Sequence, residues 1–256
     1  MVRAFRWIVL SGIQVVTSSG CTQSTEEACH DLAAARCHHH ATCSAAHLAA
    51  SFGDEPSCRA YVFARCAATA DLEGAHLDAD AITSCVDAYF GHPCDALLLD
   101  APPMACRFAG DRINGASCAT GAQCQSSFCH VPAEGQCGKC APVRKLGETC
   151  SKGGSPCDVG LHCGATLTCT PPGARSDACS PTTPCGPRLS CSGGECLPTA
   201  TAGQPCDEEH GCDPLLLLAC DPATSTCQPQ ETLPPAKICD TGPPSDPCAA
   251  PYPACP

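Results

Sequence analysis

Apolar residues in the first 110 positions follow the spacing of amphipathic helices. A stripe at i, i+3, i+4 and i+7 between Ile82 and Tyr89 predicts one helix, which ends at Gly91. The sequence Asp54-Glu55-Pro56 predicts the start of another, which runs to about Ala68, because proline is tolerated in the first turn of a helix. Residues 43–52 are a candidate for a short additional helix.

A capping box predicts the start of a further helix. Ser24 and Glu27 stand three residues apart, so the hydroxyl and the carboxylate can satisfy two amide groups of the first turn. This helix is expected from about Thr25 to Cys37.

Two pairs of cysteines lie eight residues apart in these predicted helices, Cys29 with Cys37 and Cys58 with Cys66. The spacing puts each pair on one broad face, about 12 Å apart along the axis. Antiparallel helices can then be joined at both ends, which favours bonds from Cys29 to Cys66 and from Cys37 to Cys58. The eight cysteines from Cys29 to Cys106 still allow 105 connectivities, and the sequence does not choose among them.

Residues 1–20 have the pattern of a signal peptide. A basic start precedes an apolar stretch over residues 7–16, and small residues stand directly before Cys21. The apolar stretch is about half as long as a membrane-spanning helix. The small residues resemble a bacterial lipobox, which implies acylation of Cys21 and cleavage on its amino side. Ser18 stands where that motif usually has leucine, so ordinary signal cleavage is the alternative.

Composition changes sharply after residue 110. Residues 22–110 are rich in alanine and contain four prolines, whereas residues 111–256 contain 21 prolines and 16 glycines. Six of the eight aromatic residues after Cys21 also precede residue 111. The helical domain, residues 21–110, is therefore the only region that is predicted to have a core of ordinary apolar side chains.

The second region consists of cysteine-rich repeats. Gly-x-x-Cys sequences at Gly115, Gly147 and Gly203 open three units, and Gly173 with Cys179 is taken to open another that carries three extra residues. Units of about 30 residues with so few aromatic side chains need covalent cross-links, and two disulfides per unit are expected. The predicted units are about 115–140, 147–170, 173–198 and 203–229, before a Pro-rich tail over 230–256. Their cysteines are Cys118, Cys124, Cys129 and Cys137; Cys150, Cys157, Cys163 and Cys169; Cys179, Cys185, Cys191 and Cys196; and Cys206, Cys212, Cys220 and Cys227, with Cys140, Cys239, Cys248 and Cys255 left outside.

The cysteine content indicates an oxidising compartment. Cysteine makes up 29 of 256 residues, a fraction typical of secreted disulfide scaffolds and not of cytosolic enzymes. All cysteines after Cys21 number 28, so they can pair completely. The formal net charge of −12 argues against nucleic acid as a partner.

The repeats resemble a known family. Their Gly-x-x-Cys openings and turns such as Cys220-Asp221-Pro222-Ala223-Thr224 resemble bacterial Dickkopf N-terminal cysteine-rich-type repeats. With alanine-rich helices that contain Ser51-Phe52-Gly53-Asp54, the arrangement resembles myxobacterial cysteine-rich lipoproteins. The resemblance implies surface location and extracellular binding, and it carries over no functional residue. The expected fold class is a small disulfide-rich protein, in which an N-terminal disulfide-stapled α-helical domain precedes tandem short cysteine-rich repeats with little regular secondary structure.

A cluster of histidines is the candidate metal site. Five lie between His30 and His47, and His38, His40 and His47 are the candidate ligands. Consecutive residues of a helix diverge by about 100°, so neighbouring histidines face one ion only if the helix has ended after Cys37. Solvated side chains at a helix end are the alternative.

Three further features have structural alternatives that we favour. Cys137-Gly138-Lys139-Cys140 is the sole CxxC, and its place at the end of a repeat indicates structural disulfides rather than thiol chemistry. The acidic sequences at 207–209 and 240–246 lack the ligand pattern of a calcium loop. The apolar run Leu215, Leu216, Leu217 and Leu218 either packs on the cystines and a neighbouring unit, which we favour, or contacts a partner.

No motif indicates a catalytic group or a cofactor. The favoured function is a non-enzymatic, secreted module, anchored at the bacterial outer membrane or cell surface by lipid on Cys21, or extracellular if the lipobox is not used. It binds an extracellular protein or glycan, or forms part of the envelope. A protease inhibitor on stapled loops is one alternative, and a metal-binding envelope protein that uses the His30–His47 cluster is another.

Overall fold

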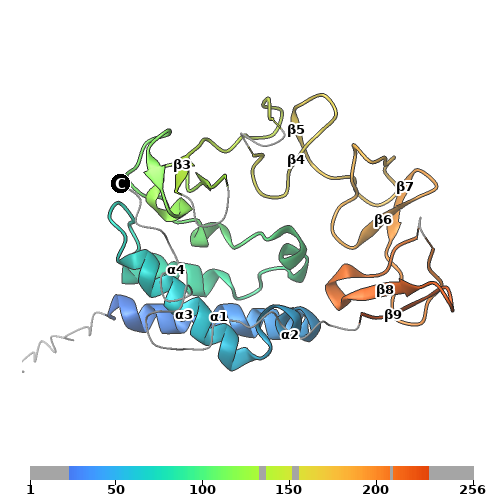
Figure 1. The fold of residues 1–256 in the computed structure, drawn as a ribbon, viewed down its shortest axis with the longest axis horizontal. Helices are drawn as coiled ribbons and strands as arrows, with labels where there is room; N and C mark the ends of the chain where they lie inside the picture. Colours follow the sequence, from blue (N-terminus) through green and yellow to red (C-terminus); the bar gives the residue numbers. More distant parts are fainter. Residues whose placement is uncertain (1–22, 133–136, 152–155, 208–209, 231–256) are drawn as a thin grey trace, which may run out of the picture.

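The structure, a computed structural model, describes residues 23–132, 137–151, 156–207 and 210–230. It has an N-terminal helical part with disulfides, followed by four short cysteine-rich units of small sheets (Figure 1). This is the expected fold class. Twelve disulfides join pairs of described cysteines. The elements in chain order are α1 (Thr25–Cys43), α2 (Ala45–Phe52), α3 (Glu55–Ala70), α4 (Ala79–Ala88), the short 3-10 helices η1 (Cys94–Leu99) and η2 (Met104–Cys106), β1 (Ser117–Cys118), η3 (Gly121–Gln123), β2 (Cys129–His130), β3 (Gly138–Cys140), β4 (His162–Cys163), β5 (Cys169–Thr170), β6 (Leu189–Ser192), β7 (Glu195–Pro198), η4 (Pro214–Leu216), β8 (Leu218–Asp221) and β9 (Thr226–Pro229).

The first helix begins where the capping box predicts but extends further. The amide of Glu27 donates to Ser24 Oγ, and the amide of Ser24 donates to Glu27 Oε2. The helix does not end at Cys37 as expected, since no helix-breaking residue follows. It ends at Cys43 and is followed by Ser44, whose amide donates to the His40 carbonyl oxygen. The hydroxyl of Ser44 accepts from the amide of His47 and so caps α2.

The helical domain has a core of apolar side chains that disulfides reinforce. Cys29 is bonded to Cys66 and Cys37 to Cys58, the two pairs that the eight-residue spacing favours. They lock α1 against α3, and Ile82 of α4 is fully buried beside them. Two more disulfides, Cys43–Cys94 and Cys85–Cys106, tie η1 and η2 to the helices. None of the helices in the described residues is long and apolar enough to span a membrane.

All four units share one disulfide pattern, in which the first cysteine bonds the third and the second bonds the fourth. Units two to four each contain one antiparallel two-stranded sheet, and the first has the strand order β1-β3-β2. In the first unit the fourth cysteine is Cys140 and not Cys137, because Cys140 bonds Cys124. Cys137 is disulfide-bonded as well. The remaining pairs are Cys118–Cys129, Cys150–Cys163, Cys157–Cys169, Cys179–Cys191, Cys185–Cys196, Cys206–Cys220 and Cys212–Cys227.

The opening of the third unit differs from the predicted one. In the other units the opening glycine has a positive φ, and its amide donates to the carbonyl oxygen of the last cysteine, as Gly147 does to Cys169. In the third unit Ser176 does this, with a φ of 68° and an amide that donates to Cys196. Gly173 instead forms an isolated parallel β-bridge with Cys185, and Arg144 forms the equivalent β-bridge with Cys157 in the preceding unit. The third unit therefore has no extra residues at its start.

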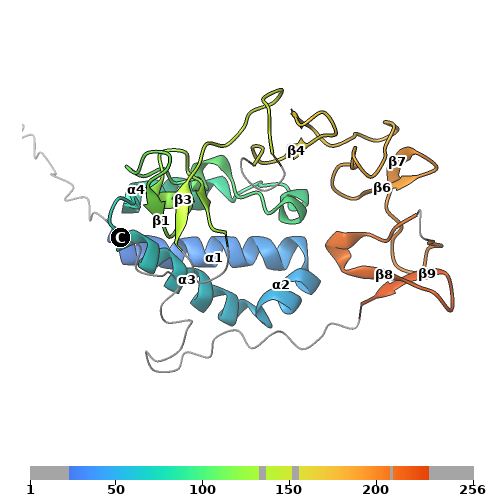
Figure 2. The same ribbon diagram turned by 45° about the horizontal axis from the view of Figure 1, so that its top comes forward.

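The units form an arch that begins and ends on the helical domain (Figures 1 and 2). At the first joint, the amide of Asp111 donates to Gly74 and the Gln123 side chain donates to the Glu73 carbonyl oxygen. Gly110 is required there, since a Cβ at this position would overlap the Gly74 carbonyl oxygen. The far end of the arch, at η4, returns to α2.

Candidate functional site

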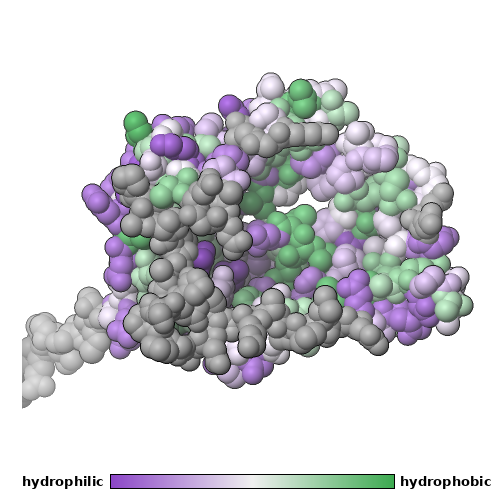
Figure 3. All heavy atoms as spheres, viewed as in Figure 1, coloured by the Kyte–Doolittle hydropathy of each residue, from purple (hydrophilic) through white to green (hydrophobic). Residues whose placement is uncertain are grey.

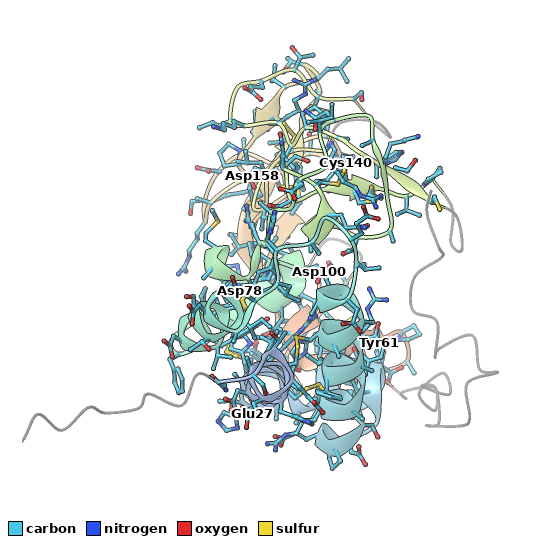
Figure 4. The ribbon with its side chains drawn as sticks, turned by 90° about the vertical axis from the view of Figure 1, so that its left-hand side faces the viewer. Glu27, Tyr61, Asp78, Asp100, Cys140 and Asp158 are labelled. Atoms are coloured by element: carbon cyan, nitrogen blue, oxygen red, sulfur yellow. A yellow bond between two sulfur atoms is a disulfide. The ribbon has the colours of Figure 1, made fainter. Side chains whose placement is uncertain are left out.

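A cleft of about 1020 Å³ lies between the helical domain and the first half of the arch. Its floor includes Arg36, His39 and His40 of α1 with Tyr89 and His92, which follow α4. Its roof comes from residues 125–128 of the first unit and 156–159 of the second. In the space-filling view it appears as an opening between the helices and the arch (Figure 3). Figure 4 places Asp100 between the helices below and Asp158 of the arch above.

Histidines hold the floor of the cleft together. His39 Nε2 lies 3.0 Å from the carbonyl oxygen of His92, and His92 Nε2 lies 2.9 Å from that of Ala101. A carbonyl oxygen only accepts, so both Nε2 atoms carry the proton and donate. The ring centroids of His39 lie 5.4 Å from His92 and 5.6 Å from Tyr89. These rings therefore fix the loop after α4 against α1.

Burial keeps His39, His40 and Tyr89 of the floor uncharged at neutral pH. Burial lowers the pKa of His39, and it lowers the pKa of His40 to about 4, with a further contribution from the positive charge of Arg36. Burial raises the pKa of Tyr89, so its hydroxyl stays protonated. The helical domain contributes the charged side chains of Arg36, Asp100 and Arg107 to the cleft, and Arg107 pairs with Asp158 of the roof.

The candidate metal ligands are not brought together. Because α1 continues to Cys43, the exposed His38 and the partly buried His40 point in different directions from the helix. His47 Nε2 instead lies 2.9 Å from the carbonyl oxygen of Pro214. Among the described residues, each group of three or more closely spaced ligand atoms consists of cysteines of one unit, whose sulfurs are in disulfides.

The leucine run does not form one surface. Leu215 and Leu218 are buried, with 4% and 8% of their surface exposed, whereas Leu216 is 43% exposed. The segment is not extended, since η4 ends at Leu216, Leu217 after it has a φ of 48°, and β8 begins at Leu218.

The leucine run instead attaches the arch to the helices. The carbonyl oxygen of Leu215 accepts a 2.5 Å bond from the buried hydroxyl of Ser44. Leu218 packs on Cys206 and Cys227 of its own unit. The sequence analysis named the cystines and a neighbouring unit as packing partners of the leucines. Nothing in the pattern of apolar residues indicated a contact with α2.

The remaining candidate residues fall into two groups. The two cysteines of the CxxC sequence, Cys137 and Cys140, are both disulfide-bonded, so neither is a free thiol. Cys140 lies in β3. The signal sequence, Cys21, Glu208, Glu209, the acidic sequence at 240–246 and the tail from residue 231 lie outside the described residues.

Sequence reasoning missed the cleft. Its floor residues Arg36, Tyr89 and His92 are far apart in the chain and match no motif. A comparison of the chain with protein-family models, curated proteins and solved structures finds no match. The cleft is therefore interpreted from its own side chains.

Proposed function

We propose that the protein is a non-enzymatic extracellular binding protein whose ligand occupies the cleft under the arch. The observation that carries this proposal is that disulfides fix the residues around the cleft. Cys43–Cys94 and Cys85–Cys106 hold the floor, and Cys124–Cys140 and Cys157–Cys169 hold the roof. A site that is ordered before binding loses less entropy on binding, which favours affinity.

The chemistry of the floor supports binding rather than catalysis. The protons on the Nε2 atoms of His39 and His92 are both engaged by backbone carbonyl oxygens, so these imidazoles position the loop after α4. Heavy disulfide bonding is consistent with an extracellular location. Acylation of Cys21, suggested by the small residues before it, would tether the protein to a membrane surface, as the resemblance to myxobacterial lipoproteins also implies.

The test fills the cleft and measures capture of a partner. Ala101→Trp puts an indole into the cleft, and Ala223→Trp, on an exposed turn of the fourth unit, is the matched control. Mature wild-type and variant chains are immobilised and exposed to solubilised envelope fractions and glycans. We expect the wild type and Ala223→Trp to capture the same ligand, and Ala101→Trp to lose it while its disulfides remain intact by mass.

Two results would contradict the proposal. Equal capture by Ala101→Trp would place the binding surface outside the cleft. Stoichiometric inhibition of a protease by both variants would favour the alternative function, a protease inhibitor on the stapled loops.

A further inference from the structure

Two hydrogen-bond donors on the floor of the cleft have no partner within the described part of the chain. Arg36 and Tyr89 both line the cleft, and neither the guanidinium nor the hydroxyl makes an ion pair or a hydrogen bond there. Arg36 is partly buried on α1, and its charge acts on both Tyr89 and His40. A guanidinium has five N–H donors, so its position in a cleft without a carboxylate partner is unusual for a structural arginine.

The charge of the cleft differs from that of the whole chain. The formal net charge of the protein is −12, but the charged side chains that line the cleft are three cations and two acids. Arg107 and Asp158 pair with each other, with Nη1 and Oδ1 2.6 Å apart. The charges that remain are Arg36 and Lys145 against Asp100. The charges in the cleft that are not paired with each other therefore sum to +1, which favours an anionic ligand.

We infer that Arg36 and Tyr89 anchor a single carboxylate of an acidic, partly apolar polypeptide segment that occupies the cleft. This inference rests on the proposed function and names the ligand of the same site. The planar guanidinium matches a carboxylate with two parallel hydrogen bonds, and the phenol donates a third.

The walls of the cleft favour a polypeptide over a glycan. Leu97, Met104, Val143 and Val159 line it, which suits apolar side chains on either side of a carboxylate. Sugars stack on open aromatic faces, but on the floor the rings of His39, Tyr89 and His92 pack on one another with centroids 5.4 to 6.0 Å apart, which leaves Phe128 of the roof as the one phenyl ring among the lining residues. Asp100 also repels a second negative charge, which disfavours polyanions such as polyuronates.

The carboxylate has two possible sources in a polypeptide, a glutamate side chain or the free carboxyl terminus, and the experiment separates them. Three libraries of N-acetylated hexapeptides carry alanine, valine, leucine, serine or proline at five positions. The fixed third position is glutamate with an amidated terminus, glutamine with an amidated terminus, or glutamine with a free terminus. Retention of each library on immobilised mature protein is measured by mass spectrometry.

We expect the wild type to retain one or both carboxylate libraries at least about tenfold better than the neutral library, the usual size of a charged hydrogen-bonded contact. Arg36→Gln should abolish that preference, Arg36→Lys should restore part of it, and Tyr89→Phe should reduce it about threefold. Arg59→Gln is the matched control, since it removes the same charge from the outer face of α3, where Arg59 pairs with Glu55.

Each contrary outcome overturns a defined step. Unchanged preference in Arg36→Gln, with loss of binding in Ala101→Trp, would disprove the anchor while the cleft remains the binding site. Retention of the peptides by Ala101→Trp would disprove the proposed function itself. Retention of none of the libraries, or Arg36-dependent binding of oligogalacturonate instead of peptides, would disprove the polypeptide ligand.

Discussion

The helical domain and the cysteine-rich units use disulfides in different ways. In the helical domain the bonds reinforce a core that also contains Leu32, Val62 and Ile82. In the first unit the buried cluster consists of cysteines alone, and in the fourth only Ala200 and Leu218 join them. Sulfur is therefore an addition to the core in one region and is the core itself in the other.

The two regions are nevertheless one structure, because repeated positions in the units have acquired contacts outside them. The residue after the second cysteine is Asp158 in the second unit and Asp213 in the fourth. Asp158 pairs with Arg107 of the helical domain, and the almost fully buried Asp213 pairs with Arg188 of the third unit, at 2.7 Å. The two regions therefore have separate cores but are joined by contacts at their surfaces.

Reduction of the disulfides should have the largest effect, because it removes the cores of the units but only part of the core of the helical domain. Each unit loses two bonds that close loops of 11 to 16 residues, or about 3 kcal/mol per bond, which exceeds what such small clusters provide. Hydrogen exchange of the reduced mature chain should show no protected amides from residue 111 onward but residual protection in α1 and α3. Protected units after reduction, or no helix in the oxidised chain, would contradict this prediction.

Gly110→Ala tests the joint between the two regions. The new Cβ would overlap the backbone oxygens of Gly74 and Ala122. Because these are backbone atoms, they cannot move aside as the end of a flexible side chain can. We expect a loss of about 3 kcal/mol in the free energy of unfolding of the oxidised chain, measured by guanidinium titration. Gly91→Ala is the control, since its Cβ meets nothing and only the positive φ of 79° costs about 1 kcal/mol. Equal losses would show that the joint tolerates displacement.

Leu215→Ala tests the other end of the arch. The buried leucine lies where η4 meets α2, so its truncation should cost about 2 to 3 kcal/mol. Hydrogen exchange should rise in α2 and in the fourth unit together. Leu216→Ala removes the same atoms from an exposed side chain and should cost less than about 1 kcal/mol. A rise confined to the fourth unit would mean that the leucine stabilises only its own unit.

The protonation of His40 gives a smaller, pH-dependent effect in the helical domain. Its pKa is about 4 in the folded chain and about 6.5 in an unfolded one, so the unfolded state binds the proton more readily between these values. The contribution is fully present above pH 6.5 and is lost as the pH falls toward 4. After allowance for solvent screening we expect about 1 to 2 kcal/mol. His40→Gln should flatten this slope in guanidinium titrations, and His38→Gln, on the exposed side of α1, should not.

The sequence predicted local elements well because capping, periodicity and cysteine spacing act over a few residues. The starts of α1 and α3 and the bonds Cys29–Cys66 and Cys37–Cys58 follow from such short-range rules. The arch and its cleft depend on contacts such as that of Ser44 with Leu215, which are 171 residues apart and involve a common side chain. No periodicity encodes a contact of that kind, so the candidate site emerged only from the structure.

Ser176→Gly tests the smallest difference between prediction and structure. Ser176 occupies the position that glycine holds in the other three units, with a φ of 68° that is strained for a residue with a Cβ. Glycine removes this strain but also makes the unfolded chain more flexible, so the net gain should be about 0.5 to 1 kcal/mol. Ser127→Gly, at a φ of 56° outside the unit openings, is the control for left-handed serines in general. A higher free energy of unfolding of Ser176→Gly in guanidinium titrations would confirm that the first position of the Gly-x-x-Cys opening requires a backbone with a positive φ, which glycine adopts without strain. A loss would mean that the side chain of Ser176 has a role that the other three units do without.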